Sequence, residues 1–333
     1  NRIINNKFKT NAILYTKTIG DLVEEEKNKL KLFPEEIKKI GNKTRALLQI
    51  QQGCDHRCTF CAIPYGRGDS VSLPLGEIVR RTEVLLESGY REITITGVDI
   101  TSYGLDLPGK PNLGLIIKRL LNMQPLLKRI RFSSIDPAEL DEDLLELIMF
   151  DERVLPHIHL STQSGDNLIL KRMKRRHNRE YVINLCKKIK DVRPEVTFGT
   201  DIIVGFPTET EKNFLNTLNF VKKCMFSNLH VFPFSPKNKT PAAKMPQVIH
   251  EIKLKRSKKL RFLGETIKQN KMKKKIGSKA RILFENKDLS YTDDYFKVKV
   301  TEISARDSQS LKGKFIDVVF KNCKNDHLEA KLL

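Results

Sequence analysis

Tryptophan is absent from this 333-residue chain, and cysteine is scarce at six residues. No run of 18 or more apolar residues occurs, which excludes an ordinary transmembrane helix. No secretory signal pattern is visible, and nothing in the cysteine usage indicates an oxidising compartment. We therefore predict a cytoplasmic protein without a disulfide framework.

Acidic residues are also in short supply, because 40 Asp and Glu stand against 61 Lys and Arg and leave a formal net charge of +21. Residues 246–279 hold twelve of these cations against two Glu, and residues 171–176 are basic as well. Clustered positive charge predicts a nucleic-acid partner, the alternative being a solvated lysine-rich surface. The predicted RNA contacts are Arg175, Lys258, Lys259, Lys273, Lys274 and Lys275.

Half of the cysteines fall in one short motif, Cys54, Cys58 and Cys61, which follows an apolar run at residues 46–50. Three thiolates on a tight loop can bind three irons of a 4Fe-4S cluster and leave the fourth iron without a protein ligand. The alternative is a structural zinc site, which needs four closed ligands. His56 lies inside the same loop, and the other cysteines are dispersed. We interpret Cys186, Cys224 and Cys323 as structural.

From residue 45 onward, strand and helix patterns alternate, which predicts parallel βα units. The predicted strands cover residues 45–51, 91–96, 128–134, 157–161, 197–204 and 229–234. The predicted helices cover residues 74–88, 137–149 (starting at Asp136-Pro137), 178–190 and 210–224, with a capping box at Thr208 and Glu211. Six such units are too few for a closed eight-stranded barrel.

The C-terminal third has a different pattern. Residues 248–275 predict a basic amphipathic helix with Ile249, Ile252, Leu260, Leu263 and Ile267 facing inward. After Gly277 the apolar residues recur with period two, which predicts a small antiparallel β-barrel of about five strands. The chain is thus predicted to divide into a core domain at 45–245, a connecting helix at 246–275 and the barrel at 276–333. Residues 1–44 are predicted to be a linker or a remnant of a truncated N-terminal domain, with a short helix from Pro34 to before Gly41.

Polar residues and glycines follow the predicted strands, at the edge where active residues of such folds lie. The second strand leads to Gly97 and Asp99, the third to Ser134, and the fourth to Gln163, with Ser164 and Asp166 interpreted as helix caps. The fifth leads to Ile203 and Gly205. Within that strand Asp201 lies between apolar residues, so we expect it to pair with Arg131, Arg175 or a ligand.

The cysteine motif, with Phe60 before its last cysteine, resembles the signature of the radical S-adenosylmethionine (SAM) enzymes. That resemblance implies an open, partial (βα)6 barrel in which SAM binds the open iron and is cleaved to a 5′-deoxyadenosyl radical. It also implies the contacts with SAM, which we assign to Phe60, Gly97, Asp99, Ser134, Gln163, Ile203 and Gly205.

Residues 53–68, 159–165, 171–175 and 199–209 resemble the methylthiotransferases of that superfamily. Residues 230–235 and 240–243 are most similar to the branch that adds a methylthio group to carbon 2 of threonylcarbamoyladenosine beside the tRNA anticodon. The terminal barrel, including residues 291–295, resembles the TRAM domain with which this family contacts RNA. The implied partners are the tRNA anticodon stem-loop, a sulfur donor, and an electron donor such as flavodoxin or ferredoxin.

One feature of that family has no counterpart here. Its members carry three further cysteines in an N-terminal domain, which hold a second 4Fe-4S cluster, whereas residues 1–53 contain no cysteine. We therefore expect a fragment or a truncated product. The alternatives within the class are methylthiotransferases for isopentenyladenosine or for a ribosomal-protein aspartate, and the alternative from another class is a non-catalytic RNA-binding iron–sulfur protein.

Overall fold

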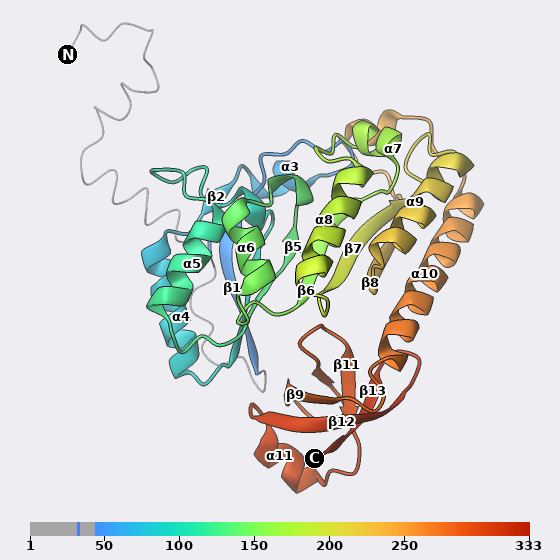
Figure 1. The fold of residues 1–333 in the computed structure, drawn as a ribbon. Coiled ribbons are helices and arrows are strands. Elements are labelled where there is room, and N and C mark those ends of the chain that lie inside the picture. The colour runs from blue at the N-terminus through green and yellow to red at the C-terminus, as the bar shows by residue number, and fades with distance from the viewer. Residues whose placement is uncertain (1–31, 34–43) are drawn as a thin grey trace, which may run out of the picture.

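The computed structural model describes residues 32–33 and 44–333 (Figure 1). The predicted helix between Pro34 and Gly41 and nearly all of the predicted N-terminal linker lie outside the described residues. Among the helices that are described, none combines the length and the apolar character that spanning a membrane requires.

The core consists of two four-stranded sheets with the orders β2-β1-β3-β4 and β5-β6-β7-β8. All neighbouring strands are parallel except β1 and β2. The predicted third strand is divided at Ser133 into β4 and β5, which separates the two sheets of the partial barrel. The predicted fold class, an open partial barrel of βα units, is confirmed. The strands are β1 (Arg45–Gln52), β2 (Val71–Ser72), β3 (Glu92–Gly97), β4 (Ile130–Phe132), β5 (Ser134–Ile135), β6 (His157–Gln163), β7 (Thr197–Val204) and β8 (Asn228–Pro233).

Helices cover the outer face of these sheets (Figure 1). The main ones are α4 (Leu75–Glu87), α5 (Leu113–Met123), α6 (Glu142–Phe150), α8 (Arg179–Val192) and α9 (Glu211–Cys224). Each turns an apolar stripe inward, because burying such a stripe against a sheet is what stabilises an amphipathic helix. Cys186 and Cys224 lie in these stripes and are buried, which confirms their structural interpretation.

Three details of the helix prediction are wrong. Helix α5 is not among the predicted helices. The predicted helix 137–149 is divided into the 3₁₀ turn η2 (Pro137–Glu139) and α6, because Asp141 caps a new helix by accepting from the amide of Leu144. Helix α9 is capped by Thr210 with Asn213, so the capping box at Thr208 and Glu211 is displaced by two residues. Short helices α3 (Ile63–Arg67) and α7 (Asn167–Arg172) flank the cysteine loop.

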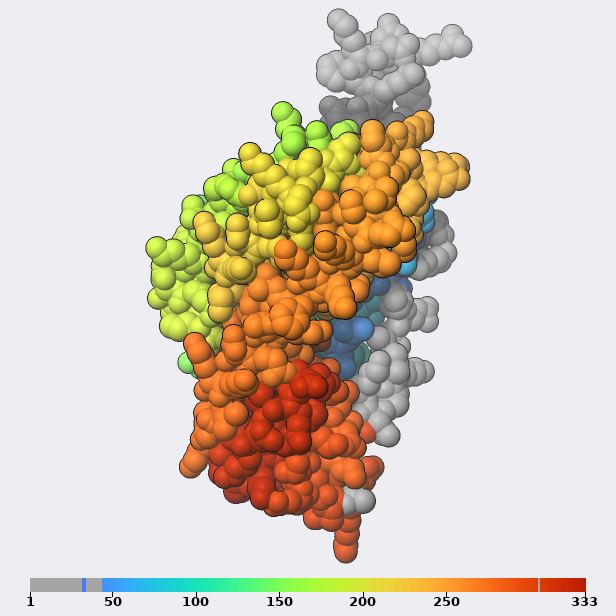
Figure 2. Space-filling model, turned by 90° about the vertical axis from the view of Figure 1, so that its right-hand side faces the viewer, coloured from blue at the N-terminus to red at the C-terminus, as the bar shows by residue number. Residues whose placement is uncertain are grey.

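Helix α10 (His250–Lys273) runs along one face of the core to the C-terminal barrel (Figure 2). Its inward face differs from the prediction at the N-terminal end, where Ile249 and Ile252 are exposed while Lys253 and Arg256 are buried. The physical reason is polar: Lys253 Nζ donates to the carbonyl of Phe234 at 3.1 Å, and Arg256 pairs with buried Glu209 at 2.7 Å. Leu260 and Ile267 are buried as predicted.

The C-terminal strands form a closed barrel with the order β10-β11-β13-β12-β9. Its interior holds the apolar residues of the period-two pattern, including Ile282, Val298 and Phe320, as predicted. Strands β11 and β13 pair in parallel, so the barrel is not wholly antiparallel. The strands are β9 (Lys279–Leu283), β10 (Ser290–Tyr291), β11 (Lys297–Val300), β12 (Phe315–Cys323) and β13 (Leu328–Leu332), with α11 (Ala305–Leu311) before β12.

Residues 291–295 of this barrel dock against the core. Arg131 donates to the carbonyls of Asp293 and Thr292 at 2.8 and 3.2 Å, and the ring of Tyr295 stacks on His157 with 4.9 Å between ring centroids. The hydroxyl of Thr197 donates to the carbonyl of Asp294 at 2.7 Å. The segment whose sequence resembles an RNA-contacting domain therefore joins the barrel to the core.

Candidate active site at the cysteine loop

The cysteine loop connects β1 to α3 and is fixed at both ends. Gly53 has φ +74°, and a Cβ atom there would lie 1.9 Å from the carbonyl oxygen of Asp69, so this turn requires glycine. The amide of Cys54 donates to the carbonyl of Gly68 at 3.1 Å. The hydroxyl of Thr59 donates to the carbonyl of Arg172 at 2.8 Å, which ties the loop to the end of α7.

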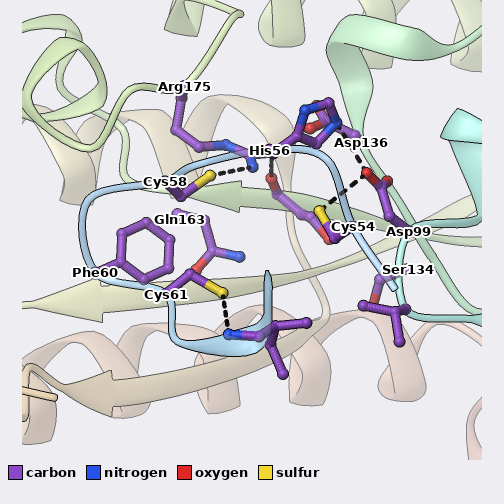
Figure 3. Close-up of a pocket in the computed structure, with 13 residues that line it drawn as sticks. Cys54, His56, Cys58, Phe60, Cys61, Asp99, Ser134, Asp136, Gln163 and Arg175 are labelled. Atoms are coloured by element: carbon purple, nitrogen blue, oxygen red, sulfur yellow. Dashed lines mark hydrogen bonds and ion pairs between the residues drawn. The ribbon is translucent and has the colours of Figure 1, made fainter. Parts of the chain in front are cut away.

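The three cysteines line one cavity at the carboxyl ends of the core strands (Figure 3). Four of the seven predicted SAM contacts line it with them: Phe60, Asp99, Ser134 and Gln163. Gln163 has φ +67°, a left-handed conformation that is strained for a non-glycine residue and typical of functional sites.

The other three predicted contacts, Gly97, Ile203 and Gly205, do not line this cavity. A Cβ atom at Gly97 would lie 2.9 Å from the carbonyl oxygen of Gln51, and one at Gly205 would lie 2.5 Å from Cγ of Lys253. Both glycines therefore permit close packing, of β3 on β1 and of β7 on α10. Ile203 packs in the small apolar cluster that also holds Phe60, and so supports one wall of the site.

The three thiols of the loop are partly buried. Burial, with the neighbouring Asp99 carboxylate, raises the pKa of Cys54 to about 12, and burial likewise raises the pKa of Cys61. Such thiols ionise at neutral pH only when a metal compensates the charge. Three sulfurs on a loop of eight residues, all facing one cavity, fit a 4Fe-4S cluster with one iron left open.

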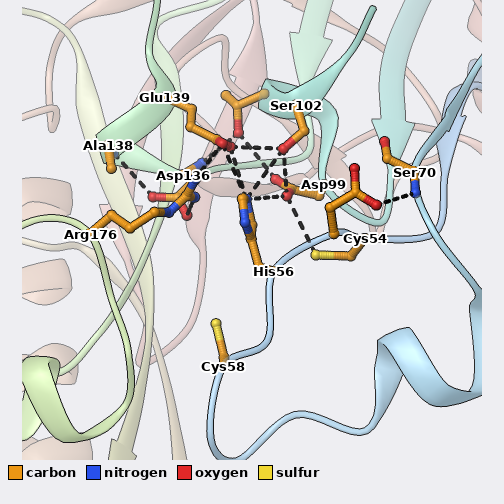
Figure 4. Close-up of polar contacts among 12 residues, drawn as sticks. Cys54, His56, Cys58, Ser70, Asp99, Ser102, Asp136, Ala138, Glu139 and Arg176 are labelled. Atoms are coloured by element: carbon orange, nitrogen blue, oxygen red, sulfur yellow. Dashed lines mark hydrogen bonds and ion pairs between the residues drawn. The ribbon is translucent and has the colours of Figure 1, made fainter. Parts of the chain in front are cut away.

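His56 reaches into a network of carboxylates (Figure 4), and its ligand nitrogen lies within 4.8 Å of the sulfur of Cys54. Its Nε2 atom lies 2.8 Å from Asp99 and 3.2 Å from Glu139, and these hydrogen bonds raise the pKa of His56 to about 10. The hydroxyl of Ser102 lies within hydrogen-bond distance of both carboxylates, at 2.8 and 2.9 Å. These contacts hold the imidazole ring between two carboxylates beside the cysteine loop.

Arg175, predicted as an RNA contact, lies instead in the cysteine cavity. Its guanidinium donates to Asp136 at 2.9 Å and to the carbonyl of Ser161 at 2.6 Å, and it approaches the sulfur of Cys58 at 3.8 Å. Its buried Nε atom has no hydrogen-bond partner within the described part of the chain. A cation with a spare donor beside the thiolates suits a negatively charged cluster or a carboxylate ligand.

The sequence did not identify the charged residues that surround the cysteine loop, because each of them fits another local pattern. Asp136 precedes the proline at which a predicted helix starts, Glu139 falls within that helix, and Arg175 lies in a basic run. No spacing rule connects His56 to Asp136 and Glu139, which only the fold brings together.

The other predicted site residues are distributed as follows. Asp201 pairs with neither Arg131 nor Arg175 but with His159 and His230, at 3.2 and 3.0 Å. The predicted RNA contacts Lys258, Lys259, Lys273 and Lys274 are exposed on or at the end of α10. Lys275 is half-buried and pairs with Asp294 at 2.7 Å.

Comparison with known proteins agrees with this geometry. Residues 48–221 match the model of the Radical SAM superfamily. The chain is 50% identical to the threonylcarbamoyladenosine tRNA methylthiotransferase MtaB of Rickettsia prowazekii over 81% of its own length and 64% of that relative. It is 36% identical to MtaB of Bacillus subtilis over 77% of its own length and 59% of that relative. It is 30% identical to the tRNA-2-methylthio-N(6)-dimethylallyladenosine synthase of Rickettsia rickettsii, over 97% and 73% of the respective lengths. The chain thus spans less than two thirds of both MtaB relatives.

Proposed function

This chain belongs to the methylthiotransferases of the radical SAM superfamily, and we propose that it acts in the methylthiolation of tRNA at carbon 2 of threonylcarbamoyladenosine. The observation that carries the proposal is the cavity in which Cys54, Cys58 and Cys61 meet polar groups from the ends of several strands.

We propose distinct roles for the residues of this cavity. Cys54, Cys58 and Cys61 would hold a 4Fe-4S cluster, whose open iron would take SAM. When bound, these cofactors supply the radical chemistry of the superfamily. Asp99 offers a carboxylate for a cationic amino group, Gln163 a neutral hydrogen-bonding amide, and Phe60 an apolar wall. Arg175 balances negative charge at Cys58.

The RNA-binding role rests on α10 and the C-terminal barrel. We propose that residues 45–245 form the catalytic domain and that residues 246–275, with a TRAM-like domain at 276–333, bind the anticodon stem-loop. Exposed lysines along α10 provide a surface for phosphates. The substrate base must also reach the cysteine cavity. A sulfur donor and an electron donor complete the proposed set of partners.

Anaerobic reconstitution tests the cluster. We expect about four irons per chain and formation of 5′-deoxyadenosine from SAM with a reductant. The Cys58→Ala variant should lose both, because two thiolates remain, whereas Cys323→Ala, far from the cavity, should keep both. Equal iron content in the two variants would contradict the assignment and favour a non-catalytic RNA-binding protein.

Mass spectrometry of tRNA from a deletion strain tests the substrate. Loss of the methylthio group from threonylcarbamoyladenosine is expected. Its loss from isopentenyladenosine alone would move the chain to the other tRNA branch, and an unmodified ribosomal-protein aspartate would indicate the protein-directed branch. The 50% identity to MtaB of R. prowazekii, against 36% for MtaB of B. subtilis and 30% for the R. rickettsii synthase, supports the first outcome.

Binding of an anticodon stem-loop at several salt concentrations tests the RNA surface. Replacing Lys258 and Lys259 by Glu should weaken binding and reduce the slope of log K against log salt by about two, if each lysine neutralises one phosphate. The matched control replaces Lys187 and Lys188, which are exposed on α8, and should leave the slope unchanged. A salt-independent affinity would leave α10 as a solvated surface.

A further inference from the structure

A second polar cavity lies between the core sheets and the C-terminal barrel, beside the cysteine cavity. Its volume is about 470 Å³, and Ser134 lines both cavities. Glu285 and Tyr295 of the C-terminal barrel contribute to its lining. The proposed function assigns no role to this cavity.

Three potential metal ligands face one another in this cavity. His159, Asp201 and His230 come from β6, β7 and β8, which are neighbouring parallel strands (Figure 1). Asp201 is directly in register with His230. His159 is in register with Gly199, where a Cβ atom would lie 2.8 Å from Nδ1 of His159, so the glycine leaves room for the imidazole ring.

The spacing of their ligand atoms suits a single ion. Oδ1 of Asp201 lies 3.2 Å from Nε2 of His159 and 3.0 Å from Nδ1 of His230, and all three atoms lie within 4.8 Å of one another. Nitrogen and oxygen ligands at about 2.0–2.2 Å from one ion are separated by roughly 2.8–3.6 Å, depending on coordination geometry. Two of the three separations already fall in that range.

The charge of the cavity leaves Asp201 available for a cation. The cavity is also lined by the carboxylate of Glu285 and by two arginines. Arg45 pairs with Glu285 at 2.6 Å, and Arg131 pairs with Glu92 at 2.6 Å. Among the described residues, no arginine or lysine pairs with Asp201. Within the described part of the chain, the side chains that hold the Asp201 carboxylate are therefore the two imidazoles.

One ligand atom is buried without a hydrogen bond. Nε2 of His159 is shielded from solvent and has no hydrogen-bond partner in the described part of the chain, since its contact with Asp201 has the distance but not the geometry of a hydrogen bond. A buried polar atom without a partner is costly, and a metal ion bound between the three residues would remove that cost.

We propose that His159, Asp201 and His230 bind a divalent transition-metal ion, such as Zn²⁺, Fe²⁺ or Co²⁺. Two imidazoles and one carboxylate form a ligand set that these ions prefer, whereas Mg²⁺ and Ca²⁺ prefer oxygen ligands alone. Three protein ligands leave coordination positions open toward the cavity, where a small molecule or a substrate group can bind. The ion is separate from any cluster held by the cysteines.

Cobalt binding to the whole chain tests this site without SAM or RNA, so its outcome is independent of the proposed function. The parent protein for this test is the triple variant Cys54→Ser, Cys58→Ser, Cys61→Ser, which removes thiolate ligation by the cysteine loop. A titration with Co²⁺, monitored by calorimetry and optical spectroscopy, should show that one ion binds per chain. The spectrum should contain no thiolate-to-cobalt charge-transfer band. Zn²⁺ should displace the Co²⁺.

Two ligand variants and one matched control complete the test. On this parent, Asp201→Asn and His230→Gln should weaken Co²⁺ binding by more than the roughly 10- to 100-fold that loss of an outer-shell partner costs. Asn228→Ala, which removes a non-ligand side chain from the same cavity, should bind as the parent does. His230 is half-exposed on strand β8, so His230→Gln should fold normally, which circular dichroism and thermal melting will check.

Three results would overturn the proposal. The first is the absence of saturable binding of one Co²⁺ per chain. The second is equal affinity of the parent and a folded His230→Gln or Asp201→Asn variant. The third is a thiolate charge-transfer band that accompanies binding.

Discussion

Replacing Glu92 by Gln should destabilise the protein strongly, because this carboxylate is the centre of a buried charge network. Glu92 is 1% exposed and pairs with Arg129 at 2.9 Å and with Arg131 at 2.6 Å. Without the carboxylate, Arg129 keeps Asp293 at 2.7 Å, but Arg131 keeps only the carbonyls of Asp293 and Thr292. A buried guanidinium would then lack a counter-charge.

The expected cost is about 3–5 kcal/mol, the usual effect of breaking a buried ion pair. With an unfolding entropy of about 2.1 cal/mol/K per residue over 333 residues, a loss of about 3 kcal/mol lowers the melting temperature by roughly 4 °C. The matched control is Glu195→Gln, which removes an exposed carboxylate from its pair with Arg193 and should cost less than about 1 kcal/mol. The assay is urea unfolding and thermal melting of both variants beside the wild type.

The dependence of the free energy of unfolding on pH provides a second test of the Glu92 network. Burial would raise the pKa of Glu92, but Arg131 and Arg129 lower it below the ordinary value of 4.5. A lowered carboxyl pKa gives stability that is present above 4.5 and is lost as the pH falls through the folded-state pKa. The difference between wild type and Glu92→Gln should therefore be largest at neutral pH and shrink in acid. A difference below 1 kcal/mol at pH 7, or one that grows in acid, would refute the reasoning.

Two further substitutions test the cysteine loop and α10. Gly53→Ala should cost roughly 1–3 kcal/mol and lower the iron content after reconstitution, because φ is +74° and the new Cβ meets the carbonyl of Asp69. Gly76→Ala, in α4 with open space around it, should instead stabilise slightly, and equal effects of the two changes would contradict this account. In α10, Leu260→Ala should cost roughly 2–5 kcal/mol, because Leu260 is fully buried. Ile252→Ala, on a side chain predicted to face inward but found exposed, should change the free energy of unfolding by less than about 0.5 kcal/mol, and a large cost there would restore the predicted helix face.

Local patterns were enough for the main features of the fold and the centre of the site. Cys54, Cys58 and Cys61 carry their chemistry in their spacing, and the alternation of strands and helices predicted the partial barrel. The period-two pattern after Gly277 predicted the interior of the C-terminal barrel. These signals depend on contacts between residues near in sequence or on a regular repeat, so they can be recognised in the chain itself.

Polar pairing between distant segments was decided only by the tertiary structure. Lys253 and Arg256 are buried in α10 because Phe234 and Glu209 provide partners, whereas a hydrophobic pattern assigns such cations to the surface. Arg175 lies beside Cys58, and Asp201 lies between His159 and His230. Both positions depend on the register of the strands and on which strand ends lie next to one another. The sequence by itself therefore determined the three-cysteine loop and the alternating architecture. The charges that surround that loop, and the second cavity beside it, arise only when strands far apart in the chain are placed side by side.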